Sequence, residues 1–499
     1  MKKAGVWFLV LSFLLCMSVL PVFAGGDASL DLEQLKGEIK RLMNKVEELE
    51  KKQKESDKKF ESVKEAATKI EKEEAQLKEE KKQKAWAYWK DGFFIETPDK
   101  QFKLQIGGTL NFDSRFFESG KSANSFDIRR ARMDMRGNIN YGGIEQVFRL
   151  QLEMADTPYV RNAYWIFKFM PELNLQAGQF KIPVGGADFL TEEAHVNFIE
   201  YATDTPVSPQ FDRGFNIISS FLGGKIQTCV GAFTGTGNDF DNNQGDWDND
   251  KNYAFRLMLV PFKDSENVYI KGLHLAGSFE DGIQSGKTVR GEASARTENY
   301  ESNWYRWIAN RVDLDDRRRY GGELHWLAGP FTASYEFNRV EWDNLKVYNS
   351  SGKVVNHLED SYHSDVHQVW ASYFLTGEQK AIEDVFFNWR QPKPKKNFSI
   401  KDGTWGAWEV IARYALHDTS DELFKGGAKA VLDGSSKGYA LTGGLRWTWN
   451  PKTRIMLDAN YLRSDEGKGI AVNRNVEGTS VRQYKDTETA VLMRLILAL

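Results

Sequence analysis

Cysteine is almost absent from this chain of 499 residues, which has only Cys16 and Cys229. Cys16 lies in an apolar N-terminal run, and Cys229 alone can form no internal disulfide, so it is expected to be a packed small side chain. No later apolar run is long enough for a membrane helix. The net charge is −3, and we find neither a basic-aromatic module nor a nucleotide or cofactor motif. We therefore expect no nucleic-acid partner, no cofactor and no metal.

The N-terminus is typical of a secretory signal. Lys2 and Lys3 precede the apolar residues 6–20, and the small residue Ala24 ends a typical cleavage site. Cys16 lacks the preceding small residue that a lipoprotein site needs, which argues against a lipid anchor. The sequence therefore predicts a removed signal peptide over residues 1–24.

Residues 29–84 are predicted to form an α-helical coiled coil. Two interleaved series recur at heptad spacing: Leu35, Leu42, Leu49, Ser56, Val63, Ile70 and Leu77, and Ile39, Val46, Gln53, Phe60, Ala67 and Glu74. Lys and Glu fill most positions between them, and no proline interrupts the run. β-branched residues followed by Leu favour two strands, although the polar members weaken the seam. The alternative is a single solvated helix.

From Gln101 onward, apolar and polar residues alternate in segment after segment. In QFKLQIGGTLNFDSRFF the apolar parity runs from Phe102 to Phe112, and the other parity carries Asp113 and Arg115. A period of two separates the two faces of a β-strand. Strands that are apolar on one face and bear arginine on the other, over hundreds of residues, indicate a closed β-barrel in lipid. The low mean hydropathy is compatible with this, because alternation hides the apolar half.

Turn signals divide the alternating region into hairpins. Short connections at residues 170–172, 221–225, 328–330 and 450–452 are expected to be periplasmic turns. The polar segments 235–252, 280–319 and 344–365 are expected to be extracellular loops. At roughly 25 residues per strand and connection, the region 91–499 suggests 16 to 18 strands, and we predict an all-β, antiparallel transmembrane barrel of about 16.

Several segments, taken together and in order, resemble the phosphate-selective porin O and P family. They are DGFFIETPDKQFKLQIGGTLNFDSRFF, FDIRRARMDMRGNI, LNLQAGQFKIPVG, FIEYATDTPVSPQFDRGFNI, ASYFLTGEQ, GAWEVIARYALHD and LTGGLRWTWNPKTRIMLDANYLRSD. The resemblance implies a 16-stranded outer-membrane barrel, usually a trimer, with a constriction loop folded inward after GQFKIPVG. It covers almost all of residues 91–499, and it allows an N-terminal coiled coil, here in the periplasm.

With the apolar parity facing lipid, the following arginines fall on the lumen side: Arg115, Arg130, Arg132, Arg136, Arg149, Arg256, Arg413, Arg446, Arg454 and Arg494. A guanidinium is always charged and binds oxyanions with two parallel hydrogen bonds, so a wall of arginines favours anions. The basic residues predicted to line the pore are Arg115, Arg130, Arg132, Arg136, Arg149, Lys181 and Arg213. The alternative is that lumen arginines simply pair with acids of the same phase, such as Asp113, Asp134 and Glu153.

The predicted constriction loop is acidic. Its acidic residues are Asp188, Glu192, Glu193, Glu200 and Asp204. The resemblance implies lysine-rich constrictions in phosphate-selective members, and this loop departs from that pattern. An acidic loop opposite an arginine wall would instead create a transverse field, which favours small polar and zwitterionic solutes.

Other functions have weaker support. His357, His363 and His367 lie among acids, but in a predicted loop without ligand spacing. No His stands beside a candidate nucleophile in the sequence, so we do not expect an enzyme. The sequence favours a passive porin for small hydrophilic solutes that leans weakly toward anions. A phosphate or polyphosphate channel is one alternative, and a tether to the cell wall through the coiled coil is another. Expected partners are outer-membrane lipid and lipopolysaccharide, two further copies in a homotrimer, and peptidoglycan under the tether hypothesis.

Overall fold

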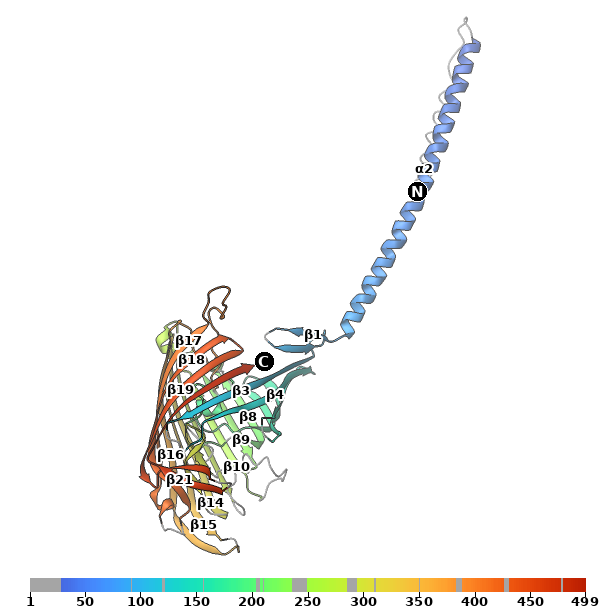
Figure 1. Ribbon diagram of the computed structural model, residues 1–499. Helices are drawn as coiled ribbons and strands as arrows, with labels where there is room; N and C mark the ends of the chain where they lie inside the picture. The colour runs from blue at the N-terminus through green and yellow to red at the C-terminus, as the bar shows by residue number, and fades with distance from the viewer. Residues whose placement is uncertain are drawn as a thin grey trace. The chain divides into compact units, whose positions relative to one another are not determined.

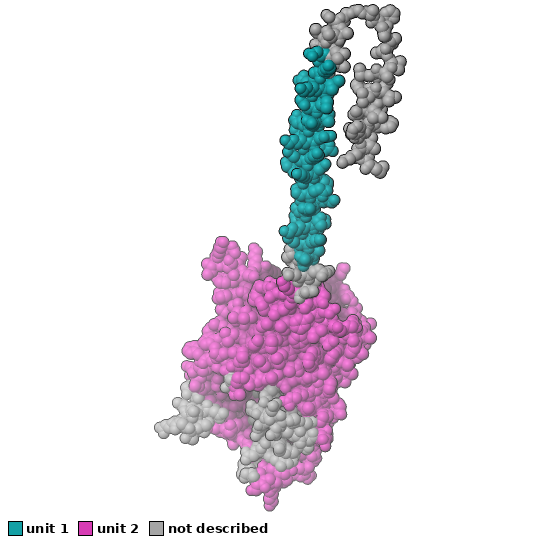
Figure 2. Space-filling view, turned by 90° about the vertical axis from the view of Figure 1, so that its right-hand side faces the viewer, with its two compact units in different colours: residues 1–83 teal, residues 84–499 magenta. Residues whose placement is uncertain are grey.

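The computed structural model describes residues 28–90, 92–118, 122–155, 157–202, 207–209, 211–235, 249–284, 294–308, 311–349, 351–382, 388–425, 430–476 and 479–499. The chain divides into two compact units, residues 1–83 and 84–499 (Figure 2). The predicted signal peptide lies outside the described residues. No helix in the described part of the chain is long and apolar enough to cross a membrane.

Unit 1 contributes one long helix, α2, over Ala28–Gln83 (Figure 1). Its 56 residues correspond to about 84 Å at a rise of 1.5 Å per residue. The heptad positions Ile39, Leu42, Val46 and Leu49 are each more than half exposed. The helix therefore has an apolar stripe that no described part of its own chain covers, and the coiled-coil part of the hypothesis stays a prediction.

Unit 2 contains a closed antiparallel barrel of sixteen strands within the described residues (Figure 1). They are β3 Phe102–Phe117, β4 Ser125–Tyr141, β5 Ile144–Glu153, β6 Tyr159–Met170, β7 Leu173–Lys181, β8 Phe211–Phe221, β9 Ile226–Phe233, β10 Asn252–Leu259, β11 Leu273–Gln284, β14 Arg311–Ala328, β15 Phe331–Tyr348, β16 Val354–Phe374, β17 Ala407–Thr419, β18 Leu432–Asn450, β19 Thr453–Gly467 and β22 Thr487–Ala498. Each strand pairs with the next, β11 pairs with β14, β19 pairs with β22, and β22 closes on β3 through Leu495↔Phe112 and Ala490↔Phe117. The predicted strand number is confirmed.

The alternation of the sequence becomes the two faces of the barrel wall. On β22, the outward Val491, Leu495 and Leu497 are about 40% exposed, whereas the inward Leu492 and Arg494 are buried. Successive side chains of a strand point to opposite faces, so every long strand presents one apolar and one polar surface. The buried interior consequently contains many charged groups.

Two shorter elements extend the barrel sheet. β1 (Trp86–Trp89) and β2 (Phe93–Glu96) form a hairpin, and β2 pairs with the start of β3. The domain was predicted to begin at residue 91, but the closed barrel begins at Phe102. At the other end, β12 (Ser294–Arg296), β13 (Ser302–Trp307), β20 (Ile470–Val476) and β21 (Thr479–Lys485) form a small sheet that joins β18.

We call the end at which β3 begins and β22 ends the proximal end, and the opposite end the distal end. The four predicted tight connections lie at the proximal end, where one forms the 3-10 turn η2 (Leu222–Gly224). Two longer connections also lie at the proximal end. They are residues 260–272, which contain α4 (Val268–Lys271), and residues 375–406. The sequence analysis missed both.

At the distal end, two predicted loops were drawn too long. β15 continues to Tyr348 and β16 starts at Val354, so most of segment 344–365 is a hairpin. Likewise, β11 reaches Gln284 and β14 starts at Arg311 inside segment 280–319. At these strand ends the alternation is inverted: Val340, Trp342, Leu345 and Val347 of β15 are buried, whereas Glu341 and Lys346 lie on the other face. The sequence analysis identified strands by an apolar outer face, so it assigned these segments to loops. The remaining distal connections include the 3-10 turn η4 (Asp421–Phe424).

Candidate functional site

The segment between β7 and β8 fills the middle of the barrel. We call residues 182–210 the inward loop; it contains the short helix α3 (Ala187–Leu190). Its apolar side chains Val184, Phe189, Val196 and Ile199 are all buried. Proximal residues 375–406 pack beneath it: Trp389 N donates to Thr191 Oγ1 at 2.8 Å, so the lumen is narrowed from both ends.

Arginines of the barrel wall hold the main chain of the inward loop. Arg256 donates to the carbonyl of Gly185 at 2.9 Å, and Arg446 donates to the carbonyl of Asn197 at 2.8 Å. Arg413 donates to the carbonyl of Glu200 at 3.1 Å. Arg454 donates to the carbonyl of Val196, and Arg494 donates to the carbonyl of Ile199. A buried carbonyl without a donor is costly, and a guanidinium has five donors to offer. These arginines therefore fix the course of the loop.

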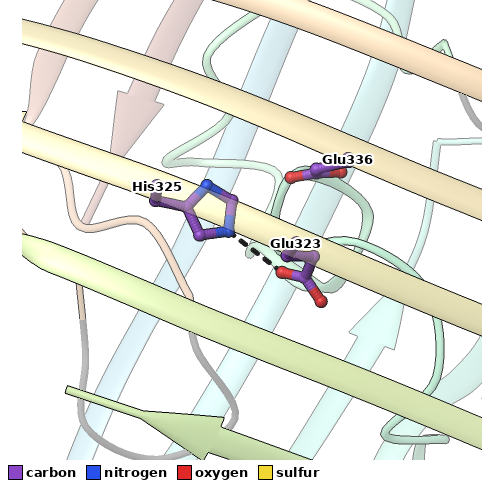
Figure 3. Close-up of side chains that lie close together, drawn as sticks. All are labelled: Glu323, His325 and Glu336. Carbon is purple, nitrogen blue, oxygen red and sulfur yellow. Dashed lines mark hydrogen bonds and ion pairs between the residues drawn. The ribbon is translucent and has the colours of Figure 1, made fainter. Parts of the chain in front are cut away.

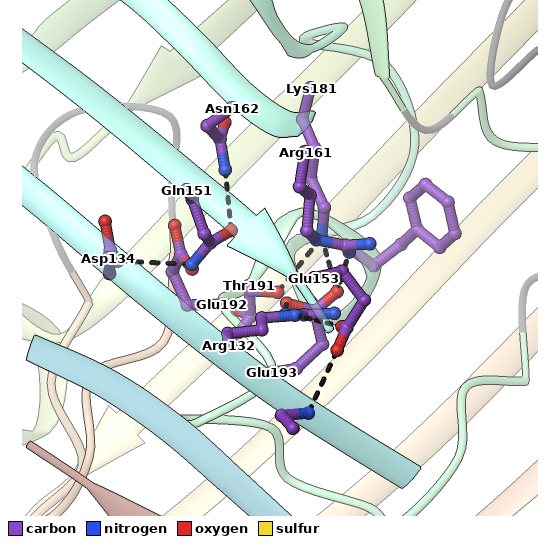
Figure 4. Close-up of polar contacts among 12 residues, drawn as sticks. Arg132, Asp134, Gln151, Glu153, Arg161, Asn162, Lys181, Thr191, Glu192 and Glu193 are labelled. Atoms are coloured by element: carbon purple, nitrogen blue, oxygen red, sulfur yellow. Dashed lines mark hydrogen bonds and ion pairs between the residues drawn. The ribbon is translucent and has the colours of Figure 1, made fainter. Parts of the chain in front are cut away.

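The acids of the inward loop form ion pairs with the same wall (Figure 4). Glu193 accepts from Arg132 at 2.6 Å and also pairs with Arg161. Glu192 pairs with Arg149. Near the end of the described loop, Glu200 accepts from Arg494 at 2.7 Å and from Arg129 at 3.2 Å.

These contacts correct the predicted transverse field. Glu192, Glu193 and Glu200 were expected to stand across an open gap from an arginine wall. Because they instead touch the arginines, each pair is close to neutral when seen from a few ångströms away. The alternative noted from the sequence, in which lumen arginines pair with acids, describes most of this surface.

The predicted basic residues have different environments. Arg115 is buried and contacts Asp113 at 2.8 Å and Glu301 at 3.1 Å. The others on the lumen side are Arg132 with Glu153 at 2.6 Å, Arg149 with Asp134 at 2.6 Å, Arg136 with Asp134 at 2.6 Å, and Lys181, which donates to Phe189 O at 2.7 Å. The carboxylate of Asp134 thus joins two arginines, and only Arg136 among these five has a half-exposed side chain.

Arg130 differs from its neighbours. It is 4% exposed, and its Nε and Nη1 atoms lack a hydrogen-bond acceptor. No carboxylate of the described residues lies within ion-pair distance of it.

Arg213 was wrongly placed in the pore. It lies on the same parity of β8 as Phe215 and Ile217, which are exposed on the outer face, whereas Asp212 and Asn216 of the other parity are buried. Its Nε donates to Gln179 Oε1 at 3.2 Å. The sequence analysis counted Arg213 among the pore-lining residues, but β8 already begins at Phe211, and strand alternation then points the Arg213 side chain to the outer face.

The last two predicted acids are Asp188 and Asp204. Asp188 is buried in α3, where Asn197 donates to it at 2.8 Å. Asp204 lies outside the described residues.

The predicted site omitted five arginines that donate hydrogen bonds to the main chain of the inward loop: Arg256, Arg413, Arg446, Arg454 and Arg494. All are 4% exposed or less. Strand alternation had placed them on the lumen side, so the signal was present. What the sequence did not show was that the inward loop reaches across the barrel to them.

The structure brings together one His and one Ser that are not neighbours in the sequence. His325 on β14 faces Ser334 on β15, with 2.8 Å between Nδ1 and Oγ, and its Nε2 lies 3.0 Å from Glu323 Oε2. The register of the hairpin pairs His325 with Ser334, although nine residues separate them in sequence. All three side chains are buried inside the wall.

The histidines at 357, 363 and 367 are not brought together. All lie on β16 rather than in a loop. Each contacts a different neighbour: His357 with Glu359 at 3.6 Å, His363 with Ser420 at 3.2 Å and His367 with Tyr335 at 2.9 Å.

The family model for "Phosphate-selective porin O and P" matches residues 75–497. The chain belongs to this family. A curated relative, Porin O of Pseudomonas aeruginosa, is 24% identical over 414 residues, which cover 78% of this chain and 89% of the relative. As a member of the family, the chain is an outer-membrane porin.

Two solved structures are also similar. The outer membrane channel DcaP of Acinetobacter baumannii has a TM-score of 0.46 and 12% identity, covering 81% of this chain and 99% of its own. The anion-selective porin from Comamonas acidovorans has a TM-score of 0.45 and 12% identity, covering 80% of this chain and 100% of its own.

Proposed function

We propose that this porin is a passive diffusion channel for small hydrophilic solutes and that it leans weakly toward anions. The observation that carries the proposal is a group of three buried arginines, Arg130, Arg413 and Arg454. None has a carboxylate of the described residues within ion-pair distance. A guanidinium that is not neutralised by its own wall attracts anions that pass nearby.

The preference is weak because most other lumen charges are paired. The arginines that contact Glu192, Glu193 and Glu200 contribute little net field. The described inward loop, residues 182–202 and 207–209, contains no Lys or Arg. A phosphate-specific channel is the second candidate, supported by the family name, and tight binding of a dense oxyanion would need more unpaired cations than this loop offers.

The variant R130A tests the proposal. Because Arg130 has no acid partner in the described part of the chain, its removal should leave the fold intact and shift the reversal potential in a KCl gradient toward cations. We expect about a fivefold drop in the chloride-to-potassium permeability ratio, because the interaction energy of two unit charges 4 Å apart in water is about 1 kcal/mol.

The matched control for this test is R136A. Arg136 is half exposed and shares Asp134 with Arg149, so its loss should change selectivity less. An unchanged reversal potential in R130A, or an equal shift in both variants, would contradict the proposal.

We also propose that the Ser334–His325–Glu323 contact has no hydrolytic role. Ser334 is 2% exposed and His325 is fully buried, so a substrate carbonyl has no path to the hydroxyl. Turnover of a short-chain nitrophenyl ester by the purified porin, lost in S334A, would overturn this.

Helix α2, which we call the stalk, is proposed to stand in the periplasm and to reinforce a homotrimer. Support comes from the exposed stripe of Ile39, Leu42, Val46 and Leu49, which further copies of α2 can cover. Three chains held together by their barrels would keep the helices at high effective concentration. A cell-wall tether is the second candidate for the stalk, and co-sedimentation of residues 28–83 with peptidoglycan would favour it.

Sedimentation equilibrium of the isolated segment 28–83 should show concentration-dependent association toward three chains. The variant I39S/L42S/V46S/L49S, which keeps the charges but removes the stripe, should stay monomeric. A wild-type segment that is monomeric at every concentration would contradict a driving role for the stalk.

A further inference from the structure

Three side chains with metal-ligating atoms meet under the inward loop (Figure 3). Glu323 and His325 project from β14, and Glu336 projects from the paired strand β15. One ligand atom from each lies within 4.8 Å of the others. His325 Nε2 and Glu323 Oε2 are 3.0 Å apart, which is about the separation of two adjacent ligands around an ion with bonds of about 2.1 Å.

This cluster carries more negative than positive charge. Glu323 pairs with Arg256 at 2.7 Å, and nearby Lys380 pairs with Glu409 at 2.6 Å. Glu336 and Asp188 have no Lys, Arg or His of the described residues within ion-pair distance. Glu336 is fully buried; among the described residues it accepts only from the Asp188 main-chain N at 3.0 Å and from Gln368 Nε2 at 2.7 Å. A buried carboxylate without a compensating positive charge is expensive, so the charge balance calls for a cation.

We propose that Glu323, His325 and Glu336 bind one divalent first-row transition metal ion, such as Zn²⁺. Imidazole together with two carboxylates suits such ions, whereas Mg²⁺ and Ca²⁺ prefer ligand sets made only of oxygen. Ser334 orients the histidine ring. When His325 Nδ1–H donates to Ser334 Oγ at 2.8 Å, the Nε2 atom of His325 points toward the two carboxylates.

The position of the site ties it to the inward loop. The main-chain N atoms of Ala187 and Asp188 donate to Glu323 at 2.9 Å and to Glu336 at 3.0 Å. Between the loop and the wall there is no room for a side chain at residue 186, because a Cβ on Gly186 would overlap the Glu336 carboxylate. A metal ion on these carboxylates would neutralise them and strengthen the attachment of α3 to β14 and β15.

All three ligands are buried, so the ion is expected to enter as the barrel folds and to leave slowly. The site is independent of the proposed anion preference, which rests on other residues.

The test uses the full-length porin, refolded with Zn²⁺ and then dialysed against metal-free buffer. Metal analysis should find about one Zn²⁺ per chain in the wild type and at least a tenfold reduction in H325A and E336Q. H357A and E145Q are the matched controls, because they remove an exposed imidazole and an exposed carboxylate. Both should retain the ion.

A second readout is the temperature at which the folded barrel converts to the unfolded band on a denaturing gel. Refolding with EDTA should lower it for the wild type. E336Q should convert at a higher temperature than EDTA-treated wild type, because it relieves an uncompensated buried charge, and Zn²⁺ should not change it. Fewer than one Zn²⁺ per ten chains, equal loss from H357A or E145Q, or a less stable E336Q would overturn the proposal.

Discussion

Replacing Arg494 by methionine should lower the free energy of unfolding of the porin by about 3–5 kcal/mol, the cost of breaking a buried ion pair from one side. Arg494 is fully buried on β22. It contacts Asp113 at 2.7 Å, on the strand that closes the barrel, and Glu200 at 2.7 Å, on the inward loop. Without it, two buried carboxylates lose a shared partner at the β22–β3 seam.

The measurement is urea unfolding of the refolded protein in detergent, together with single-channel conductance. We expect an earlier unfolding midpoint and a larger, noisier conductance, because the loop loses one of its anchors. R463M is the control: Arg463 and Asp465 are exposed, and their pair should be worth less than about 1 kcal/mol. The double variant R494M/D113N should recover part of the loss. Equal stability of R494M and R463M would contradict this account of the loop.

Replacing Glu193 by glutamine should make the channel distinctly more anion-selective. Glu193 is 3% exposed and pairs with both Arg132 and Arg161, and Arg132 has Glu153 as a second partner. The neutral amide leaves one uncompensated positive charge at the narrowed level of the lumen. The interaction energy between this charge and an ion that passes 4 Å away is about 1–4 kcal/mol, depending on local screening. The chloride-to-potassium permeability ratio should therefore rise about tenfold or more.

The reversal potential in a KCl gradient measures this shift. E145Q is its control, because Glu145 is exposed and pairs with Lys168 at 3.3 Å near the proximal end of β5. A shift toward cations in E193Q, or an equal shift in E145Q, would show that the Glu193 pair does not set the local charge.

The barrel could be predicted from the sequence because its physical cause is local. Alternation decides which face of a strand each side chain occupies, and it identified the outward Leu495 and the inward Arg494 without any knowledge of neighbours. It failed in the hairpin that contains Tyr348 and Val354, because there the buried side chains of β15, such as Leu345 and Val347, are apolar and the other face is polar, which is the reverse of the pattern in the rest of the wall.

The arrangement of the lumen was less predictable because it depends on contacts between distant segments. The partners Glu200 and Arg494 are separated by 294 residues. Nothing in the sequence sets the depth to which the inward loop enters, so paired charges were expected to face each other across a gap. His325 and Ser334 meet only through strand register, and Trp389 reaches Thr191 from a connection that was not foreseen.

The most direct test of the central claim is the current carried by the full-length porin in a planar bilayer. In a KCl gradient with added phosphate, we predict steady, ungated conductance, a reversal potential slightly on the anion side, and no block of the chloride current by micromolar phosphate. The absence of conductance would contradict the channel itself. A block at micromolar phosphate would contradict weak selectivity and establish a phosphate-binding constriction.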